Sequence, residues 1–544
     1  MQGKPLALPL VAVLLLAGCA APGADVDAAA GAAAGPFEPL TEDVFGFGDL
    51  LAAKVPSFDG VQIHVDVQLP DGDGPFPVLV EYTPYSSTLN PNRELWGNGL
   101  AQHALASYYV PKGYAFAIAH VRGSGQSGGC FTTGGPEEAQ DGYALVEWLA
   151  AQPWSSGKVA LMGTSYVGTT PISTATLAPP HLTTIVPVAA VTEWYRYYFE
   201  NGEPRLFGEL PFGVVYTDHP LWAATGLVPK PRNPLGVDPA SVRCGMAQMQ
   251  NAWLQDDYND YWMARNYVKD IANATAPMLY AHGFLDENTA TSLVTAFYDA
   301  YPGEKRMWLQ QHGHGVPGSF RAYHEYVHRW LDHFMLGRDN GALLLPSVVL
   351  QDDRGQYHVQ ADWPPRNASI RLLHLGAGTL AATAPADGTA RYRADTENLT
   401  FWTEPLAEDL HVTGAPRVEL VAASDATDTQ WDVQLYAVDD DGWHFVTRGY
   451  LDARHRASLQ RGVDVVPGEE SLYVVTMHGR DVHVAAGQRL VLVVASVDPY
   501  VVPDAPGATN TLRLGPAGSR LALPVLEDAT FADAPPAPWD ERSA

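Results

Sequence analysis

The chain has 544 residues, with 61 Asp and Glu against 33 Lys and Arg, which gives a formal net charge of −28. This length predicts two or more domains with sizeable cores. The shortage of cations argues against a nucleic-acid partner, because phosphate contacts need clustered Lys and Arg. We interpret the acidity as a solvated surface that keeps the protein soluble.

The first 19 residues have the pattern of an export signal. Lys4 precedes an apolar stretch that is too short to span a bilayer as a mature helix, and the stretch ends in Leu16-Ala17-Gly18-Cys19. This ending resembles the lipobox of prokaryotic lipoproteins. We expect residues 1–19 to be a lipoprotein signal peptide with lipidation at Cys19, and residues 20–40 to be a flexible tether. Ordinary cleavage just after Cys19 is the alternative, and both predict an extracytoplasmic protein, either membrane-anchored or secreted.

Residues 41–345 alternate between strand and helix patterns, which is typical of an α/β domain. An alternating run at 61–69 predicts an edge-like antiparallel strand. Apolar runs predict further strands at 77–82, 114–119, 159–162, 184–189, 277–281 and 307–309, and the last of these closes the sheet. Helical periodicity predicts helices at 141–149, 169–177 and 323–334. Between about 194 and 274 the pattern breaks, and we interpret this part as an inserted helical cap.

A short motif follows the predicted strand at 159–162. It reads Gly163-Thr164-Ser165-Tyr166-Val167-Gly168 and resembles the Gly-x-Ser-x-Gly elbow, although its second glycine comes one residue later. A sharp turn from strand to helix exposes such a serine, and only small neighbours allow the turn. We therefore predict that Ser165 is a nucleophile and that the N–H of Tyr166 is an oxyanion donor. A simple small-residue turn is the alternative.

A serine nucleophile needs a base and an acid that orients the base. In α/β-hydrolases the chain order is Ser, then Asp or Glu, then His. Asp286 follows the predicted strand at 277–281, and His314 follows the strand at 307–309. Carboxyl ends of strands are where open α/β sheets bind ligands. We therefore predict the triad Ser165, Asp286 and His314. Glu287 is the alternative acid, and His312 is the alternative base.

Two further features are less specific. Gly123-Ser124-Gly125-Gln126-Ser127-Gly128 matches the dinucleotide fingerprint, but no helix pattern starts directly after it, so we predict a structural loop beside the active-site cleft. Cys130 and Cys244 could form a disulfide in an exported protein, or remain two buried thiols. Their spacing does not predict a metal site, and we expect no metal and no cofactor.

After residue 345 the helical pattern nearly disappears. Short alternating runs recur at 417–421, 431–438, 444–450 and 489–494, and Asp441-Gly442 predicts a hairpin turn. This pattern is typical of a β-sandwich, so we predict a second, all-β domain at 346–544.

The chain resembles the X-Pro dipeptidyl-peptidase and cocaine-esterase group of α/β-hydrolase serine hydrolases. The matching segments are Pro84-Tyr85, the Arg122–Gly128 loop, Gln152–Val159, Gly163–Gly168, Gly283–Asp286, His314-Gly315, Thr403–Leu406 and Thr413–Val418. The resemblance implies an α/β-hydrolase domain with a helical cap, a C-terminal jelly roll, the same triad, and the Tyr85 hydroxyl as second oxyanion donor. His120 departs from the acid that many members carry there. Asn288 and Thr289 stand where α-amino-acid ester hydrolases have extra carboxylates, which puts that substrate preference in doubt.

We therefore expect a serine hydrolase that works through an acyl-enzyme, either X-Pro dipeptidyl-peptidase-like or by related ester or amide hydrolysis. The alternatives are a small-molecule carboxylesterase and an inactive, carbohydrate-binding surface protein. The expected partner is a short peptide, ester or amide, the membrane is reached only through the lipid anchor, and a homodimer is left open. Cap aromatics are candidates for the substrate pocket, or for packing between cap and core: Trp194, Tyr195 and Tyr198, with Tyr197 and Phe199 beside them. Glu193, Glu200 and Glu203 could anchor a peptide amino terminus, with a solvated surface as the alternative.

Overall fold

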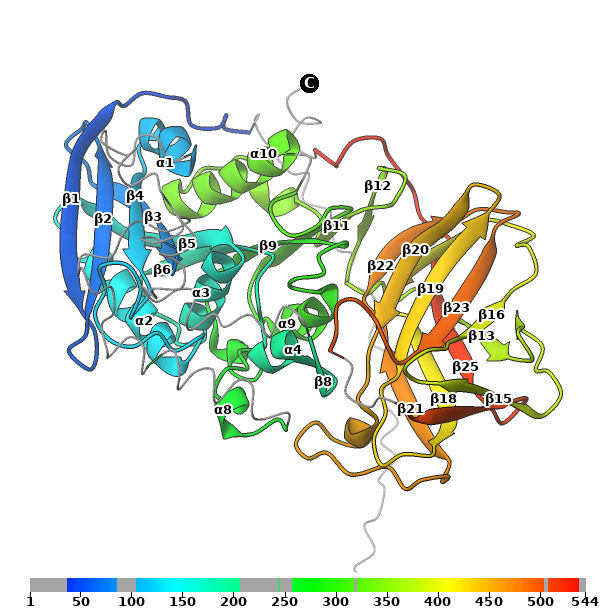
Figure 1. Cartoon of the computed structure of the whole chain (residues 1–544). Coiled ribbons are helices and arrows are strands. Elements are labelled where there is room, and N and C mark those ends of the chain that lie inside the picture. The colour runs from blue at the N-terminus through cyan, green and yellow to red at the C-terminus, as the bar shows by residue number, and fades with distance from the viewer. Residues whose placement is uncertain are drawn as a thin grey trace, which may run out of the picture. The chain divides into compact units, whose positions relative to one another are not determined.

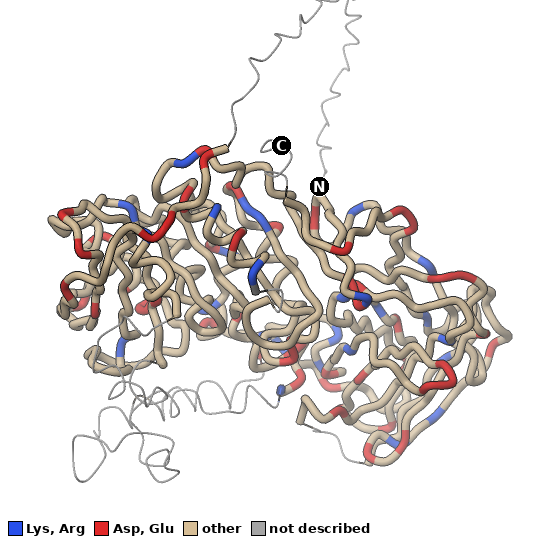
Figure 2. The backbone as a smooth tube through the Cα atoms, turned by 90° about the horizontal axis from the view of Figure 1, so that it is seen from above, with Lys and Arg blue, Asp and Glu red and all other residues tan. Residues whose placement is uncertain are grey.

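The structure is a computed structural model that describes residues 37–85, 104–205, 244, 257–317, 320–502 and 507–537. The predicted signal peptide, Cys19 and most of the predicted tether lie outside these residues. Among the helices in the described ranges, none has the length and apolar character needed to cross a membrane. Figure 2 shows that acidic positions are spread widely along the described backbone.

A ten-stranded sheet runs through the first part of the chain in the order β1-β2-β4-β3-β5-β6-β9-β10-β11-β12 (Figure 1). The strands are β1 (Phe47–Pro56), β2 (Gln62–Pro70), β3 (Phe76–Thr83), β4 (Ala115–His120), β5 (Ser155–Thr164), β6 (Leu182–Val188), β9 (Met278–Gly283), β10 (Lys305–Gln310), β11 (Val348–Gln351) and β12 (Tyr357–Gln360). The seven strands from β4 to β11 in this order are parallel to their neighbours. β1, β2 and β12 pair antiparallel. Such a mixed sheet is the predicted α/β class.

Two predictions about the sheet edges were wrong. The strand predicted at 61–69 is β2, which lies between β1 and β4 and is not an edge. The strand at 307–309 does not close the sheet either, because β11 and β12 continue it past residue 345. β1 is largely exposed and β11 has only four residues, so neither has the strong apolar run that identified the central strands.

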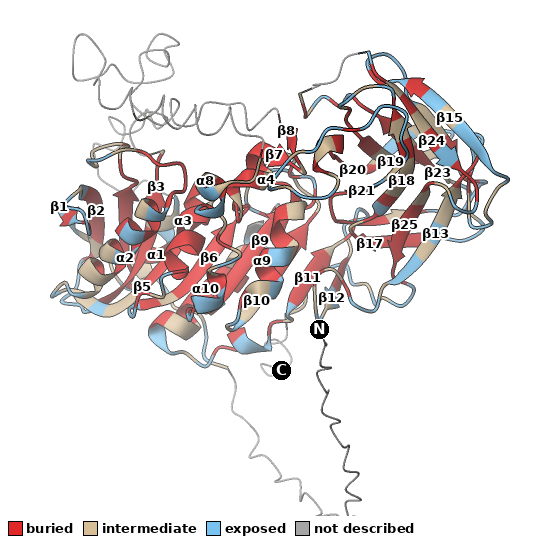
Figure 3. Cartoon of the chain, turned by 90° about the horizontal axis from the view of Figure 1, so that it is seen from below, coloured by how far each residue is buried: buried red, intermediate tan, exposed pale blue. Residues whose placement is uncertain are grey.

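Helices cover both faces of the sheet because its parallel strands alternate their side chains between two cores (Figure 3). Val78 and Val80 of β3 face one core, and Leu79 between them faces the other. The first core contains residues of α2 (Pro136–Ala150), α3 (Tyr166–Ala175) and α9 (Val294–Ala300). The second contains residues of α1 (Ala104–Tyr109) and α10 (Phe320–Leu331). A π-helical turn (Asp332–Leu336) follows α10, and Gly337 ends it in the left-handed conformation.

The second part of the chain is a β-sandwich, which confirms the predicted all-β fold. One sheet contains β13 (Ser369–Leu375), β14 (Leu380–Ala381), β15 (Gly388–Arg393), β17 (Leu410–Gly414), β18 (Arg417–Ser424), β21 (Ser471–Thr476), β22 (Arg480–Val484), β24 (Thr509–Leu514) and β25 (Arg520–Val525). The other contains β16 (Leu399–Trp402), β19 (Asp432–Asp439), β20 (Gly442–Gly449) and β23 (Arg489–Ala495). Side chains from both sheets share one apolar core. The predicted turn at Asp441-Gly442 joins β19 to β20.

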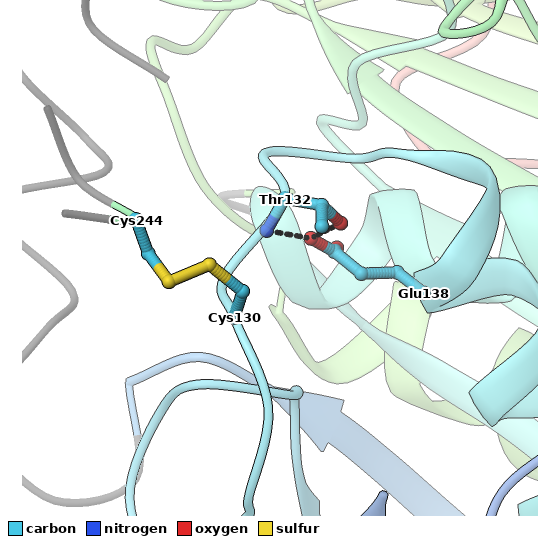
Figure 4. The surroundings of a disulfide bond; sticks show 4 residues. All are labelled: Cys130, Thr132, Glu138 and Cys244. Atoms are coloured by element: carbon cyan, nitrogen blue, oxygen red, sulfur yellow. Dashed lines mark hydrogen bonds between the residues drawn. A yellow bond between two sulfur atoms is a disulfide. The ribbon is translucent and has the colours of Figure 1, made fainter. Parts of the chain in front are cut away.

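Most of the predicted cap at about 194–274 lies outside the described residues. Its described parts are α4 (Trp194–Tyr198), the short hairpin of β7 (Phe199–Glu200) and β8 (Glu203–Pro204), α8 (Asp260–Met263) and a 3-10 turn (Ile271–Asn273). Cys244 is joined to Cys130 in a disulfide with a Cα–Cα distance of 5.6 Å (Figure 4). The disulfide links two segments 114 residues apart, so the structure settles the pairing that the sequence left open.

A buried pair of carboxyl groups joins β8 to the sandwich. Glu203 of β8 and Asp432 of β19 are both fully buried, and a shared proton lets the Glu203 carboxyl donate a hydrogen bond to the Asp432 carboxylate. Burial raises the pKa of both groups, and the pKa of Glu203 is raised further by the charges of Asp432, Asp452 and Asp498. The pair therefore keeps at least one proton over a pH range in which ordinary carboxyl groups are ionised.

This pair predicts a loss of stability as the pH rises. The unfolded chain releases these protons near pH 4, whereas the folded chain keeps them to higher pH. The free energy of unfolding should therefore fall above about pH 4, by up to about 1.4 kcal/mol per pH unit for each retained proton. Asp432→Asn should flatten this dependence, measured by urea unfolding between pH 5 and 8. The exposed control Asp464→Asn should leave the slope unchanged, and equal slopes for Asp432→Asn and the parent would contradict the prediction.

Candidate active site

Ser165 lies at the turn between β5 and α3 and has a φ of 65°, which is unusual for a residue other than glycine. Two glycines make this turn possible. A Cβ on Gly163 would lie 2.4 Å from Cγ1 of Val167, and one on Gly168 would lie 2.5 Å from the carbonyl oxygen of Val188 in β6. Gly168 therefore lets α3 start close against β6. The elbow tolerates the shifted spacing because the close contact is made at residue 168.

Two donors lie beside the Ser165 hydroxyl. The Tyr85 hydroxyl donates to Oγ of Ser165 at 3.3 Å, and the backbone N–H of Tyr166 donates to the Tyr85 hydroxyl, also at 3.3 Å. Tyr85 follows β3, and its own N–H donates to Thr83 Oγ1 at 3.0 Å. The phenol and the amide thus meet next to the serine oxygen, where a tetrahedral intermediate would carry its negative charge.

Asp286 and His314 follow β9 and β10, which are adjacent parallel strands. Nδ1 of His314 lies 2.8 Å from Oδ2 of Asp286. Asp286 is fully buried and also accepts hydrogen bonds from the N–H of Asn288 and from the N–H and hydroxyl of Thr289. Burial alone would raise the pKa of Asp286, but the hydrogen bond from His314, the attraction to the His282 and His314 rings when these carry a proton, and the Thr289 hydroxyl outweigh it and hold this pKa far below its usual value. The carboxylate is therefore ionised and fixes Nδ1 of His314 as the protonated nitrogen.

The alternative acid and base point elsewhere. The Glu287 carboxylate pairs with Arg480 at 3.2 Å. The His312 ring packs against Gly283, where an added Cβ would lie 2.2 Å from Nδ1 of His312, and burial lowers the pKa of this histidine. His282 is fully buried, and its Nδ1 lies 2.9 Å from the Tyr280 hydroxyl. Burial lowers the pKa of His282 to about 4, so its ring stays neutral next to Asp286.

A cavity of 370 Å³ opens over Ser165 and His314. Its described lining is as follows: Tyr85, Thr164, Ser165, Tyr166, Val191, Trp194, Tyr197, Asn288, Thr289 and His314. The structure therefore brings together all three predicted triad residues and both predicted oxyanion donors. The Ser165 hydroxyl and the His314 ring share this cavity without a hydrogen bond between them, a loose arrangement that is common in hydrolases without substrate.

Of the cap aromatics suggested for the substrate pocket, Trp194 lines the described cavity, whereas Tyr195 and Tyr198 take the alternative role of packing. Trp194 and Tyr197 are three residues apart on α4, so they share one helix face, and both line the cavity. Tyr195 and Tyr198 are absent from the described cavity lining and pack against Trp262 of α8 at ring distances of 5.8 and 5.3 Å. These two tyrosines therefore join α4 to α8.

The three acidic residues suggested as amino-terminus anchors do not line the described cavity. Glu193 pairs with Arg196 at 3.2 Å. Glu200 accepts from Nε2 of His478 at 2.8 Å, and Glu203 faces Asp432. Glu200 and Glu203 are buried, so a solvated surface was also the wrong interpretation for them. Glu200 and Glu203 lie where the cap segment meets the sandwich. None of the described residues that line the cavity is acidic.

The Gly-rich loop 123–128 packs on β2, where the N–H of Gly128 donates to the carbonyl of Gln62, and it does not line the described cavity. The segment that follows this loop, which includes Gly134 and Glu138, contacts the side chain of Tyr166. The Tyr166 hydroxyl donates to Glu138 at 2.7 Å and accepts from the N–H of Gly134 at 2.8 Å. Glu138 is buried in the first turn of α2 and thus fixes the residue that carries the amide donor. The role of Glu138 was not predicted, because the helix predicted at 141–149 begins after it, whereas α2 begins at Pro136.

The sandwich also contacts the loop of the predicted acid. Arg480 of β22 donates to the Glu287 carboxylate at 3.2 Å, and Arg205 donates to the carbonyl oxygens of Glu287 and Asn288. Both arginines are fully buried. No local pattern could have identified Arg480, because it lies almost 200 residues after its partner.

Comparison with known proteins agrees with this geometry. A model of the family described as X-Pro dipeptidyl-peptidase (S15 family) matches residues 59–316. A model described as X-Pro dipeptidyl-peptidase C-terminal non-catalytic domain matches residues 340–519. The first match contains the elbow, the acid and the base, and the second covers most of the sandwich.

Similar proteins span most of the chain. A putative Xaa-Pro dipeptidyl-peptidase of Bacillus cereus is 28% identical over 524 residues, which cover 86% of this chain and 87% of the relative. A CocE/NonD family hydrolase from Staphylococcus aureus has a similar fold, with a TM-score of 0.75 at 18% identity over 89% of this chain and 97% of its own. An aminopeptidase from a marine sediment Thaumarchaeota archaeon has a TM-score of 0.73 at 19% identity over 90% of this chain and 98% of its own. The two family models together cover most of the chain, so the chain belongs to the X-Pro dipeptidyl-peptidase (S15) family of α/β-hydrolases, and it is a serine hydrolase.

Proposed function

We propose that the chain hydrolyses an acyl bond through an acyl-enzyme formed on Ser165. The observation that carries this proposal is one cavity holding the strained Ser165, the His314–Asp286 pair and two hydrogen-bond donors. His314 has its Nδ1 proton directed to Asp286, so its Nε2 lone pair is free to accept the serine proton. The serine oxygen then attacks the substrate carbonyl, and the imidazolium returns the proton to the leaving group. Water activated by the same nitrogen releases the acid and restores the serine.

The Tyr85 hydroxyl and the Tyr166 amide stabilise the tetrahedral intermediate in this proposal. In the free protein the amide donates to the phenol oxygen. A substrate oxyanion placed beside Ser165 would accept from both donors, and this interaction is strongest in the transition state. The fixed side chain of Tyr166, held by Glu138, keeps the amide in place without reorganisation.

Removing the phenol should slow catalysis while binding is largely kept. We expect Tyr85→Phe to lower kcat by about 10²- to 10³-fold, because one oxyanion donor is lost and the ring remains. The measurement is steady-state hydrolysis of a p-nitrophenyl ester, with KM and kcat determined separately. Tyr143→Phe, at a half-exposed position on α2, is the matched control. An unchanged kcat for Tyr85→Phe would remove Tyr85 from the proposed oxyanion site.

The acyl-enzyme itself can be trapped. Rapid mixing with an excess of a p-nitrophenyl ester should release a burst of about one nitrophenol per chain if deacylation is slower than acylation. Quenching in acid and peptide mapping should then place the acyl group on the peptide that contains Ser165. Acyl transfer to any other side chain, or hydrolysis without a mapped adduct under conditions that give a burst, would contradict the proposed chemistry.

For the substrate, we propose a short acyl group that packs on Trp194 and Tyr197. X-Pro peptides are one class, supported by the names of the relatives and by aromatic faces that suit a proline ring. Compact carboxylic esters are the second, favoured because the described cavity lining has no carboxylate to bind a free amino terminus. Rates on Ala-Pro-p-nitroanilide, its N-acetyl form and p-nitrophenyl acetate separate the two classes. A peptidase would prefer the free amine strongly over the acetylated peptide, whereas an esterase would cleave only the ester rapidly.

We also propose that the chain is exported and lipidated at Cys19. The apolar stretch before Leu16-Ala17-Gly18-Cys19 supports export, and so does the Cys130–Cys244 disulfide, because disulfides persist mainly in oxidising compartments. Mass spectrometry of the protein isolated from a membrane fraction should find a lipidated Cys19 as the first residue. A soluble product that begins after Cys19 would support the secreted form instead.

A further inference from the structure

A second cluster of potential metal ligands lies away from the proposed active site. His358 of β12, His411 of β17 and Asp481 of β22 are all buried, with exposed fractions of 3%, 8% and 0%. β12 is the last strand of the ten-stranded sheet, whereas β17 and β22 are paired strands of the sandwich. The cluster therefore contains side chains from both folded parts of the chain.

The three side chains direct their ligand atoms at one another. Nε2 of His358 lies 2.6 Å from Oδ2 of Asp481, and Nε2 of His411 contacts Oδ1 of the same carboxylate. Any two of the three ligand atoms lie within 4.8 Å. Two imidazole nitrogens and a carboxylate are a ligand set that zinc uses in proteins, with bonds of about 2.0 to 2.2 Å. Small rotations of the rings away from Asp481 would make room for an ion between them.

The surroundings are also consistent with a cation. Asp352 and Asp353 pair with His483, whose ring stacks on His411 with a centroid distance of 4.2 Å. Negative charge is thus concentrated next to the cluster. The amide nitrogen of Gln360 lies 3.3 Å from Nδ1 of His358. A 180° rotation of this amide would place its oxygen there instead, where it would accept from the Nδ1–H of a metal-binding ring.

The cluster has a route to solvent. A cavity of 580 Å³ is lined by His411 and His483 together with Arg354, Arg371 and Phe531. His411 therefore belongs both to the cluster and to the cavity wall. An ion could reach the cluster through this cavity, and water there could complete its coordination.

We propose that His358, His411 and Asp481 bind one divalent transition-metal ion, with zinc as the preferred ion. The ion would join the edge of the ten-stranded sheet to the sandwich, and it takes no part in the proposed acyl chemistry. The competing arrangement has Asp481 accepting two N–H hydrogen bonds without a metal.

Another three-residue cluster serves as a comparison. His64, Asp66 and His120 lie on β2 and β4 with their ligand atoms equally close. The backbone N–H of Gln126 donates to Nδ1 of His120 at 2.9 Å. This bond places the proton of the neutral ring on Nε2, so His120 lacks the free lone pair that a ligand needs. We therefore expect the ion at His358, His411 and Asp481 and not at this second cluster.

The test measures metal binding by the whole protein, independently of hydrolysis. The protein is stripped with a chelator, given zinc chloride and desalted, and bound zinc is counted by elemental analysis. We expect one equivalent in the parent, and a zinc affinity at least tenfold lower in both His411→Ala and Asp481→Asn. The control variants His64→Ala and His314→Ala should still bind one equivalent of zinc. The His314→Ala control excludes the possibility that the zinc is bound at the proposed active site.

A thermal measurement covers the case in which a variant fails to fold. Zinc should raise the melting temperature of the parent, and cobalt in its place should give the visible absorption of a low-coordinate ion. The proposal is overturned if the parent holds no zinc after desalting, or if the bound zinc survives in His411→Ala. It is also overturned if cobalt shows only the spectrum of the hydrated ion in the presence of the parent.

Discussion

Replacing Ser165 with alanine should lower kcat by about 10⁶-fold and abolish labelling by a fluorophosphonate probe. Among the described residues that line the cavity, Ser165 carries the one hydroxyl that combines a strained backbone with the two donors and with His314. Without it no acyl-enzyme forms, and only the residual effect of the donors and of binding remains. The measurements are hydrolysis of an activated ester and mass shift after probe treatment.

Ser107→Ala, at an exposed position on α1, is the control for this variant and should behave as the parent. Melting curves of both variants show whether the fold is kept, and we expect it to be, because Cβ is unchanged. If Ser165→Ala is still labelled as rapidly as the parent, Ser165 is not the nucleophile, and another hydroxyl in the cavity must be sought.

Replacing Asp286 with asparagine should lower kcat by about 10⁴-fold. The Asn288 and Thr289 amides donate to Oδ1 of Asp286, so the asparagine oxygen should take that position and its NH₂ should face Nδ1 of His314. His314 would then accept at Nδ1 and carry its proton on Nε2. In that tautomer the nitrogen next to Ser165 cannot remove a proton. The measurement is kcat on an activated ester at neutral pH.

Asp270→Asn, with a half-exposed side chain, should leave kcat unchanged. Glu287→Gln tests the alternative acid directly, because Glu287 adjoins Asp286 but pairs with Arg480. We expect Glu287→Gln to keep most of kcat even if it lowers the melting temperature. A kcat loss that is larger for Glu287→Gln than for Asp286→Asn would reverse the assignment of the acid.

The central strands and the triad order could be predicted because they depend on local patterns. The run 277–281 is apolar throughout and 77–82 is apolar except at Glu81, since parallel strands covered on both faces need few polar positions. The edges of the sheet gave weaker signals. β1 is mostly exposed, and the four residues of β11 resemble a sandwich strand until β10 is placed next to them.

In the candidate site, too, some features could be predicted from the sequence and others could not. Ser165, Asp286 and His314 each follow a recognisable strand, so their positions at the carboxyl edge of the sheet follow from the topology. The sequence predicted His314 but left His312 open as the alternative, and the structure distinguishes them because His314 contacts Asp286 whereas the His312 ring packs against Gly283. The same holds for α4, where Trp194 reaches the cavity and Tyr195 packs on α8.

The amino-acid sequence by itself determined the two folded parts, the serine elbow and the chain order of the predicted triad. These features depend on periodicity and on small residues at fixed spacing, which any chain of this sequence must satisfy locally. Only the tertiary structure decided that Glu200 and Glu203 meet the sandwich, that Arg480 reaches Glu287, and that His358, His411 and Asp481 come together. The reason is that side-chain contacts between distant segments depend on how the strands are ordered and packed, and residue spacing along the chain does not contain that information.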